Sequence, residues 1–193
     1  MSDIQGKADS RRMNDDVVYR AHSMMHKAIV QMDPTKLELL EDFEMSEGGH
    51  KYAPEHSNVR VIISGKDWSN KRFLIYGCKS SEEAQEHIES IIDLIERIGH
   101  TAKIINAPEI KNIAVSGDLG EAQVLEEIAV ELQNQGCEVE YEPEQFPAVI
   151  IRLASPSVTF LIFSNGKFSI QGLQNPQEIE PQIKRVKELL TCD

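Results

Sequence analysis

The stretch YEPEQFPAVIIRLASPSVTFLIFSNGKFSIQG, residues 141–172, decides the fold of this chain. We expect three strands in series, at Ala148 to Leu153, Val158 to Phe163 and Phe168 to Gln171. The dipeptide Asn165–Gly166 separates the second strand from the third. Asn-Gly is a strong hairpin signal, because both residues tolerate the positive φ of a tight type I′ turn. The stretch therefore predicts an antiparallel β-sheet.

The second of these strands is apolar on both of its faces. Successive side chains of a strand point to opposite sides of the sheet. One face carries Thr159, Leu161 and Phe163, and the other carries Val158, Phe160 and Ile162. One face can pack on helices, and the other must meet a partner that accepts exposed apolar side chains.

Four motifs in this half resemble the second repeat of the TATA-box-binding protein family. They are YEPEQFP (residues 141–147), Arg152, LIFSNGK (residues 161–167) and the upstream NIAVSGDLG (residues 112–120). Together they cover roughly residues 110–190 in the family's order and spacing. The resemblance implies an α+β fold: two pseudo-symmetric repeats form a curved antiparallel sheet, a saddle, with helices on its convex face.

The resemblance also implies that the concave face of the sheet binds the minor groove of DNA, and this family is itself the standard example of that mode. The minor groove offers a degenerate hydrogen-bonding pattern, so apolar side chains can rest against A·T pairs that lack the guanine amino group. Phenylalanines at the sheet edge can insert between base steps, most easily at flexible steps such as TA.

Carried onto this sequence, the resemblance gives roles to individual residues. Phe146 and Phe163 match the family's paired wedging phenylalanines. Thr159 and Leu161 match contacts with the floor of the groove, and Asn112 matches an asparagine that hydrogen-bonds base edges. Five further positions match DNA-facing places, of which the two basic ones match phosphate contacts: Ala114, Arg152, Lys167, Ser169 and Gln171.

The loop before Phe146 resembles the stirrup that the family presents to its partner, transcription factor B. Its matching residues are Glu142, Glu144 and Gln145. Through this factor the resemblance also implies an indirect link to the RNA polymerase machinery.

Three residues depart from the family's pattern at positions that face the groove. Ser169 and Gln171 stand where small or β-branched residues are usual, and Ala114 replaces a common valine. A minor-groove contact stays possible, whereas a strict preference for TATA sequences becomes an open question.

The chain divides into a polar tail at residues 1–14, expected to be disordered, and two repeats at residues 15–105 and 106–193. Gly77 and Gly172 match each other at a separation of 95 residues, which indicates a duplication. The first repeat is degenerate. Its candidate DNA contacts are Ile63, Leu74 and Tyr76.

Helix signals complete the outline. Ser80 and Glu83 form a capping box before a helix that ends at Gly99. We also expect a strand at Ala28 to Met32 followed by a helix from Asp33 and Pro34, in DPTKLELLEDF. In the second half we expect a helix near Glu121 to Gln133, with Val124, Leu125, Ile128 and Leu132 on one side, and a last one from Pro176 to Leu190 with Asn175 as its N-cap.

Composition gives a mixed message about DNA. The net charge is −12; residues 106–193 carry 14 acidic and 6 basic side chains, and residues 1–105 carry 18 and 14. Phosphate binding normally draws on Lys and Arg. Three of the six basic residues of the second half, Lys111, Arg152 and Lys167, fall on or beside the expected DNA side. The sequence therefore predicts weak or strongly salt-dependent DNA binding.

Cysteines, motifs and hydropathy narrow the class of protein. Three scattered cysteines without CxxC spacing (Cys78, Cys137 and Cys192) favour a reducing compartment over disulfides or a zinc site. His22 and His26 could share a metal on a helix, but VVYRAH reads equally well as a strand and a third ligand is not evident, so we expect no metal and no cofactor. Neither nucleotide-binding loops nor a catalytic triad can be recognised, which argues against an enzyme.

Two functions of different kinds remain open. The first is a general transcription initiation factor of archaeal type that binds and bends A/T-rich promoter DNA. The second is a divergent paralogue that acts through protein partners with weak or no DNA binding. A sheet that binds a small molecule or peptide is a more distant alternative. With no apolar run of membrane-spanning length, the expected location is the cytoplasm and nucleoid of an archaeon, or the nucleus of a eukaryote.

Overall fold

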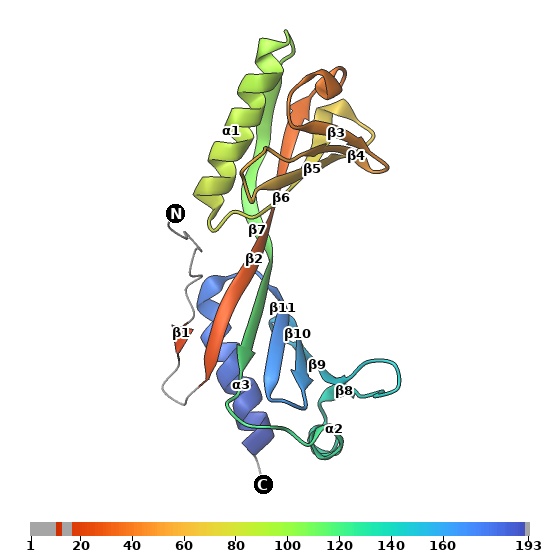
Figure 1. The fold of residues 1–193 in the computed structure, drawn as a ribbon, viewed down its shortest axis with the longest axis vertical. Helices are drawn as coiled ribbons and strands as arrows, with labels where there is room; N and C mark the ends of the chain where they lie inside the picture. Colours follow the sequence, from red (N-terminus) through yellow and green to blue (C-terminus); the bar gives the residue numbers. More distant parts are fainter. Residues whose placement is uncertain (1–10, 13–16, 192–193) are drawn as a thin grey trace, which may run out of the picture. The chain divides into compact units, whose positions relative to one another are not determined.

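The computed structural model describes residues 11–12 and 17–191. The chain forms two compact units. We call residues Ser23–Asn112 the N-terminal unit, and the segments up to His22 and from Ile113 onward the C-terminal unit. The fold is α+β, an antiparallel sheet with helices packed on it (Figure 1).

In the N-terminal unit the strand order is β2-β6-β5-β4-β3, and every pair is antiparallel. The unit's helix α1 follows β6 and lies along the sheet (Figure 1). The elements are β2 (Val18–Met32), η1 (Leu37–Leu39), β3 (Phe43–Ser46), β4 (Gly49–Tyr52), β5 (Arg60–Ser64), η2 (Trp68–Asn70), β6 (Lys71–Tyr76) and α1 (Ser81–Arg97).

The C-terminal unit has the corresponding order, β7-β11-β10-β9-β8, again antiparallel throughout. In this order β7 pairs with β11, as β2 pairs with β6 in the N-terminal unit, and a helical segment follows β11 as α1 follows β6. The elements are β1 (Arg11–Arg12), β7 (Ala102–Asp118), α2 (Leu125–Asn134), β8 (Glu138–Glu140), β9 (Ala148–Ala154), β10 (Ser157–Phe163), β11 (Lys167–Leu173), η3 (Pro176–Glu178) and α3 (Ile179–Thr191).

Helix α1 begins as its capping box predicts. Ser80 Oγ accepts the Glu83 N–H at 3.1 Å, and Glu83 Oε2 accepts the Lys79 N–H at 2.6 Å. These bonds satisfy donors that the first turn of a helix leaves without a partner. One stripe of the helix then packs on the sheet and is buried, namely Ala84, Ile88, Ile91 and Ile95.

The helix expected from Asp33 is wrong, because only the single turn η1 forms there. The Asp33 carboxylate accepts both the N–H and the hydroxyl of Thr35, at 2.9 and 2.8 Å. Lys36 then takes a left-handed conformation, with φ of 66°. An aspartate that bonds locally favours a turn over a helix, and a left-handed residue interrupts the ladder of helical hydrogen bonds.

In the C-terminal unit the expected hairpin forms around Asn165–Gly166. Gly166 has a φ of 80°, and a Cβ there would stand 2.0 Å from the Glu121 carbonyl oxygen. Only glycine fits such a position. Helix α2 differs from expectation, since Val124 precedes it and is 55% exposed, and its buried residues are Leu125, Ala129 and Leu132.

The start of the last helical segment agrees with its predicted cap. The Asn175 side chain accepts the Gln177 N–H at 3.0 Å, and Pro176 opens the turn η3 that leads into α3.

The expected boundary between residues 105 and 106 falls inside strand β7. The two compact units divide instead within β2, after His22, and within β7, after Asn112. Most of the tail at residues 1–14 lies outside the described residues. Within it, Arg11–Arg12 form strand β1, paired with β2.

Candidate nucleic-acid interface

One face of the C-terminal unit's sheet is left partly exposed by the alternation of its strands. On β10 the predicted division holds: Val158, Phe160 and Ile162 are buried, while their neighbours on the other side are half-buried. Residues paired across antiparallel strands project to the same side of the sheet. We therefore define the open face of the C-terminal unit as Ser116, Ile150, Arg152, Thr159, Leu161, Phe163, Ser169 and Gln171.

The register brings most of the sequence-predicted residues of this half together. Leu161 pairs with Ser169 on one side and Ile150 on the other. Thr159 likewise lies between Gln171 and Arg152. The resulting surface is apolar at its centre with short polar groups around it, which suits contact with the shallow edges of base pairs.

Two phenylalanines stand at one end of this face. Phe146 is 41% exposed, and its ring centroid lies 6.1 Å from that of Phe163 at an interplanar angle of 65°. The backbone reason is the register, since Phe163 pairs with Ala148 and Phe146 lies two residues before Ala148. The rings form an edge-to-face pair, a favoured aromatic geometry, and remain on the surface of the unit.

Two glutamates on the edge strand neutralise Arg152. Its Nη1 lies 2.9 Å from Glu140 Oε2, and its Nε lies 4.0 Å from Glu138 Oε1. The cause is again the register, because Glu138 pairs with Arg152 and Glu140 with Ile150. The guanidinium predicted to meet a DNA phosphate therefore already has two anionic partners, and these carboxylates would repel a phosphate.

Three further predicted residues lie on β11 and β7, and Asn112 among them is the last residue of the N-terminal unit. Lys167 is exposed at the start of β11, where its cross-strand partner is Asp118. On β7, Asn112 and Ala114 are half-buried and alternate with two buried residues, Ile113 and Val115. All three predicted positions therefore lie at partly exposed places on their strands.

Sequence reasoning missed Ile150 and Ser116. Ile150 is half-buried between buried neighbours on β9, and the same period of two that identified Leu161 could have identified it. Ser116 pairs with Ser169, and its hydroxyl is hydrogen-bonded to the His22 ring. The His22 contact could not be predicted, since it joins segments 94 residues apart.

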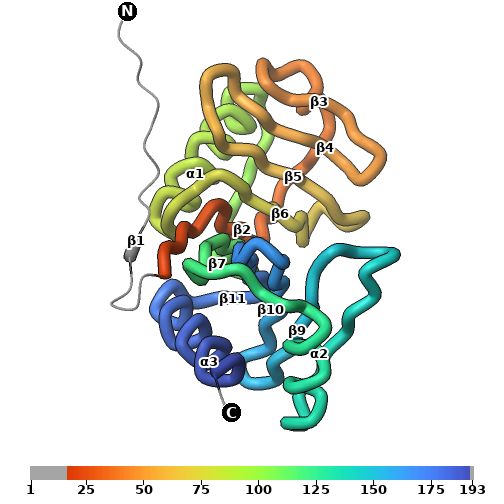
Figure 2. The backbone as a smooth tube through the Cα atoms, turned by 60° about the horizontal axis from the view of Figure 1, so that its bottom comes forward, coloured from red at the N-terminus to blue at the C-terminus, as the bar shows by residue number. Residues whose placement is uncertain are grey.

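The loop between β8 and β9 presents the residues predicted to meet a protein partner. Glu142, Glu144 and Gln145 are all exposed. A tight turn shapes the loop, because the N–H groups of Gln145 and Phe146 both donate to the Glu142 carbonyl at 2.9 Å. Figure 2 shows the loop, in cyan, extending away from the strands of its unit.

The open face of the N-terminal unit differs in character. Leu74 and Tyr76 are half-buried there, as expected, whereas the assignment of Ile63 is wrong. Ile63 is 1% exposed and belongs to the hydrophobic core with α1, so it cannot contact a ligand. Its neighbour Ile62 pairs with Leu74 and occupies the open face instead.

The register also identifies the counterparts of the two phenylalanines. Ile162 pairs with Phe168 in one unit as Ile63 pairs with Phe73 in the other, so Ser64 corresponds to Phe163. Gly49 pairs with Ser64 as Ala148 pairs with Phe163, which makes Glu47 the counterpart of Phe146. The N-terminal unit therefore carries a glutamate and a serine at these two positions.

The same face of the N-terminal unit is basic. Cross-strand pairing places four cationic side chains on the side of Ile62 and Leu74. Lys51 forms an ion pair with Glu44, with Nζ 3.2 Å from Oε2. The pKa of Glu109 is lowered chiefly by its hydrogen bond from Lys111, and the charge of Lys27 lowers it further. The four residues are Lys27, Lys51, Arg60 and Arg72.

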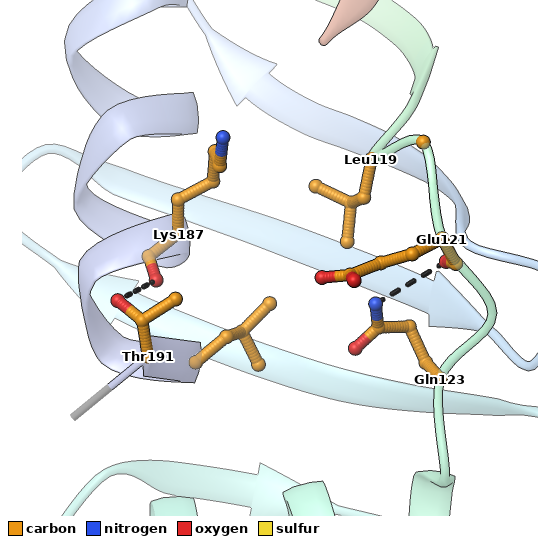
Figure 3. A pocket seen from close by; sticks show the side chains of 7 residues that line it. Leu119, Glu121, Gln123, Lys187 and Thr191 are labelled. Carbon is orange, nitrogen blue, oxygen red and sulfur yellow. Dashed lines mark hydrogen bonds between the residues drawn. The ribbon is translucent and has the colours of Figure 1, made fainter. Parts of the chain in front are cut away.

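A hollow of about 260 Å³ in the C-terminal unit is a weaker candidate for a site. It lies between α3, which contributes Lys187 and Thr191, and the segment after β7, which contributes Leu119, Glu121 and Gln123 (Figure 3). Two of its polar groups already bond backbone carbonyls: Thr191 Oγ1 donates to Lys187 at 3.0 Å and Gln123 Nε2 to Glu121 at 3.2 Å. The hollow is therefore better explained as packing between a loop and a helix.

Fold and surface together define a class: an α+β protein with one strand order in both units and an apolar open face that ends in paired aromatic rings. Residues 107–192 match the family described as transcription factor TFIID, or TATA-binding protein. The structure also resembles a chain described as Methanococcus jannaschii TBP, with a TM-score of 0.73 and 27% identity over 89% of this chain and 97% of that one.

Curated relatives give the same result. The chain is 38% identical over 116 residues to the TATA-box-binding protein of Archaeoglobus fulgidus, covering 59% of this chain and 61% of that protein. It is 37% identical to that of Methanocaldococcus jannaschii, over 59% of this chain and 60% of that protein. The matches thus span about three fifths of the length of these relatives.

The match of residues 107–192, the archaeal relatives and the structural likeness agree in showing that the chain is similar to TATA-box-binding proteins. In the part of the chain that the structure describes, none of the helices is long and apolar enough to cross a membrane.

Proposed function

We propose that the protein is a transcription initiation factor that binds promoter DNA in the minor groove and bends it. The observation that carries this proposal is the pair of exposed Phe146 and half-buried Phe163 at the end of an apolar open face. An aromatic ring that enters between two base pairs unstacks them and kinks the duplex. The apolar residues beside the pair, Thr159 and Leu161, would then rest on the floor of the widened groove.

Affinity in this proposal comes mainly from apolar contact and from the N-terminal unit's basic face. Lys27, Arg60 and Arg72 can neutralise phosphates there, whereas Arg152 is held by Glu138 and Glu140. Lys167, Asn112, Ala114, Ser169 and Gln171 line the remaining contact. Because each neutralised phosphate releases counterions, binding should weaken steeply with salt.

The exposed loop of Glu142, Glu144 and Gln145 is proposed as the surface that recruits transcription factor B, and through it the RNA polymerase machinery. Its two carboxylates are exposed, and that of Glu142 also accepts a hydrogen bond from the Gln145 side chain; both can face a basic partner surface, which would steer association. The archaeal relatives support placing this activity in the compartment that contains the genome.

A second candidate is a paralogue that acts through protein partners and binds DNA poorly. Two observations favour this candidate. The N-terminal unit has Glu47 and Ser64 at the positions that correspond to Phe146 and Phe163. Arg152 already forms ion pairs with two carboxylates.

The test is a mobility-shift and bending assay on an A/T-rich promoter fragment labelled with a donor and an acceptor dye at its ends. The proposal predicts a bent complex that Phe163→Ala abolishes, while the matched Ser64→Ala variant keeps it. Thermal unfolding of both variants must match the parent, because the ring lies on the surface. A chain that gives no bent complex even with transcription factor B present would support the paralogue instead.

A further inference from the structure

Three potential metal ligands meet at the beginning of α1 in the N-terminal unit. The sulfur of Cys78, a carboxylate oxygen of Glu83 and a ring nitrogen of His87 all lie within 4.8 Å of one another. Cys78 lies two residues after the end of β6 and is 2% exposed. Glu83 and His87 are half-buried and lie four residues apart, one above the other on the same side of the helix.

A fourth side chain comes from the sheet beneath the helix. His26 on β2 pairs with Ile75 on β6, on the side of the sheet that α1 covers, and it is fully buried. Among the residues that the structure describes, neither nitrogen of its ring has a hydrogen-bond partner. Its ring lies outside the group of three ligand atoms that stand within 4.8 Å of one another.

A buried imidazole without a partner costs free energy, because water no longer satisfies its two nitrogens. A neutral imidazole has a free lone pair, which is the form that binds a metal ion. Coordination would therefore give this side chain the partner it lacks.

Glu83 can take part without giving up its role in the helix cap. Its Oε2 accepts the Lys79 N–H at 2.6 Å. The second carboxylate oxygen is thus available, and the cap fixes its direction. Metal-ligating carboxylates are commonly oriented by a hydrogen bond of this kind from an outer group.

We propose that Cys78, Glu83 and His87 bind a divalent transition-metal ion, with Zn²⁺ as the best fit and the unpartnered His26 ring as the candidate for its fourth ligand. One thiolate, two imidazoles and one carboxylate match the ligands that zinc takes in four-coordinate sites. Magnesium and calcium prefer oxygen ligands only, so a site with a cysteine disfavours them. Ligands around tetrahedral zinc stand about 3.5 Å apart, so small rotations would bring Cys78, Glu83 and His87 onto one ion, whereas the His26 ring would have to move further.

The ion would join β2, β6 and α1, three elements that are far apart in the sequence. Because the folded unit presents the ligands together and the unfolded chain does not, binding would stabilise the N-terminal unit. We infer that the site is structural and lies on the helix side of the sheet, away from the open face.

The experiment uses the full chain, freed of metal with a chelator and dialysed. Isothermal titration with ZnCl₂ should give one ion per chain, and saturating zinc should raise the melting temperature by about 5 °C. Titration with Co²⁺ should give the visible bands of a tetrahedral ion together with thiolate-to-cobalt charge transfer. Binding by less than half an equivalent, or cobalt bands without a thiolate component, would overturn the proposal.

Variants assign the ligands. Cys78→Ser should remove the charge-transfer band, while the matched Cys137→Ser in the C-terminal unit should keep it. His87→Gln, at a half-buried helix position that tolerates the change, should weaken zinc binding at least about tenfold, whereas His56→Gln at an exposed position should not. His26→Leu should weaken it similarly. Unchanged binding in the Cys78 or His87 variant would refute the site. These readouts involve no DNA, so they stand apart from the test of the proposed function.

Discussion

The two units share a strand order and differ in what they place on their open faces. The C-terminal unit has an apolar centre that ends in the pair Phe146 and Phe163, and its one arginine there is held by glutamates. The N-terminal unit has Glu47 and Ser64 at the corresponding positions, together with four cationic side chains. Under the proposed function, one framework would support two kinds of contact: insertion between bases in one unit and attraction to phosphates in the other.

The largest expected effect comes from removing both rings of the C-terminal unit. Phe146→Ala with Phe163→Ala should weaken binding to an A/T-rich duplex roughly a hundredfold, since stacking of one base on an aromatic ring contributes about 1–3 kcal/mol. Fluorescence anisotropy measures the affinity. The matched double variant Glu47→Ala with Ser64→Ala should bind at least as well as the parent. Equal losses in the two double variants would contradict the division of roles.

The converse substitution should make the units more alike. Glu47→Phe with Ser64→Phe places an aromatic pair where the register matches Phe146 and Phe163, so the N-terminal unit should gain a wedge. We expect about tenfold tighter binding and a larger bend angle by energy transfer between dyes at the two DNA ends. A bend angle equal to that of the parent would show that the register alone does not confer the function.

Removing the two glutamate partners of Arg152 tests the electrostatic difference between the two units. Glu138→Gln with Glu140→Gln removes two carboxylates and leaves the guanidinium for a phosphate, so affinity should rise a few-fold at low salt. The slope of log affinity against log salt should steepen by about 0.9 for the one new phosphate contact. A control, Glu127→Gln on α2, should leave the slope unchanged. An unchanged slope in the double variant would mean that Arg152 does not face DNA.

On the basic face of the N-terminal unit, removal of a cation should make DNA binding less dependent on salt. Arg60→Ala removes one phosphate contact and should reduce the salt slope by about 1, while it weakens binding to all sequences alike. Affinity series for A/T-rich and G/C-rich duplexes between low and high salt provide the measurement. A loss confined to the A/T-rich duplex would instead indicate a base contact.

The smallest effects concern stability. Ser80→Ala and Asn175→Ala remove the side-chain caps at the starts of the last helical segments of the two units. Each should lower the free energy of unfolding by about 1 kcal/mol, measured by urea denaturation. If only Ser80→Ala is destabilising, the Asn175 cap does not contribute to stability, and the two units differ in this respect.

The sequence predicted the C-terminal unit well because local signals and tertiary structure agree in it. The alternation on β10 and the Asn165–Gly166 turn each determine which face a residue takes, and the structure keeps both. Asn175 and Ser80 were also found, because a cap depends on neighbours within a few residues.

The failures arose where local patterns compete or where distant partners decide. DPTKLELLEDF has helical periodicity, but the bonds from Thr35 to Asp33 and the left-handed Lys36 end the helix after one turn. Ile63 was placed on the wrong face, because a shift of one residue in a strand reverses every side chain. The glutamates on Arg152 and the cluster around His26 depend on cross-strand register, which single-sequence patterns do not give.

The most direct test of the division between the units is base unstacking at each end of the binding site. A fluorescent base analogue, 2-aminopurine, is placed at one end or the other of an A/T-rich duplex, and the chain is oriented on the site with transcription factor B. The account predicts a rise in fluorescence at the single end that meets Phe146 and Phe163, and the rise disappears in Phe163→Ala. Equal unstacking at both ends, or at neither, would contradict it.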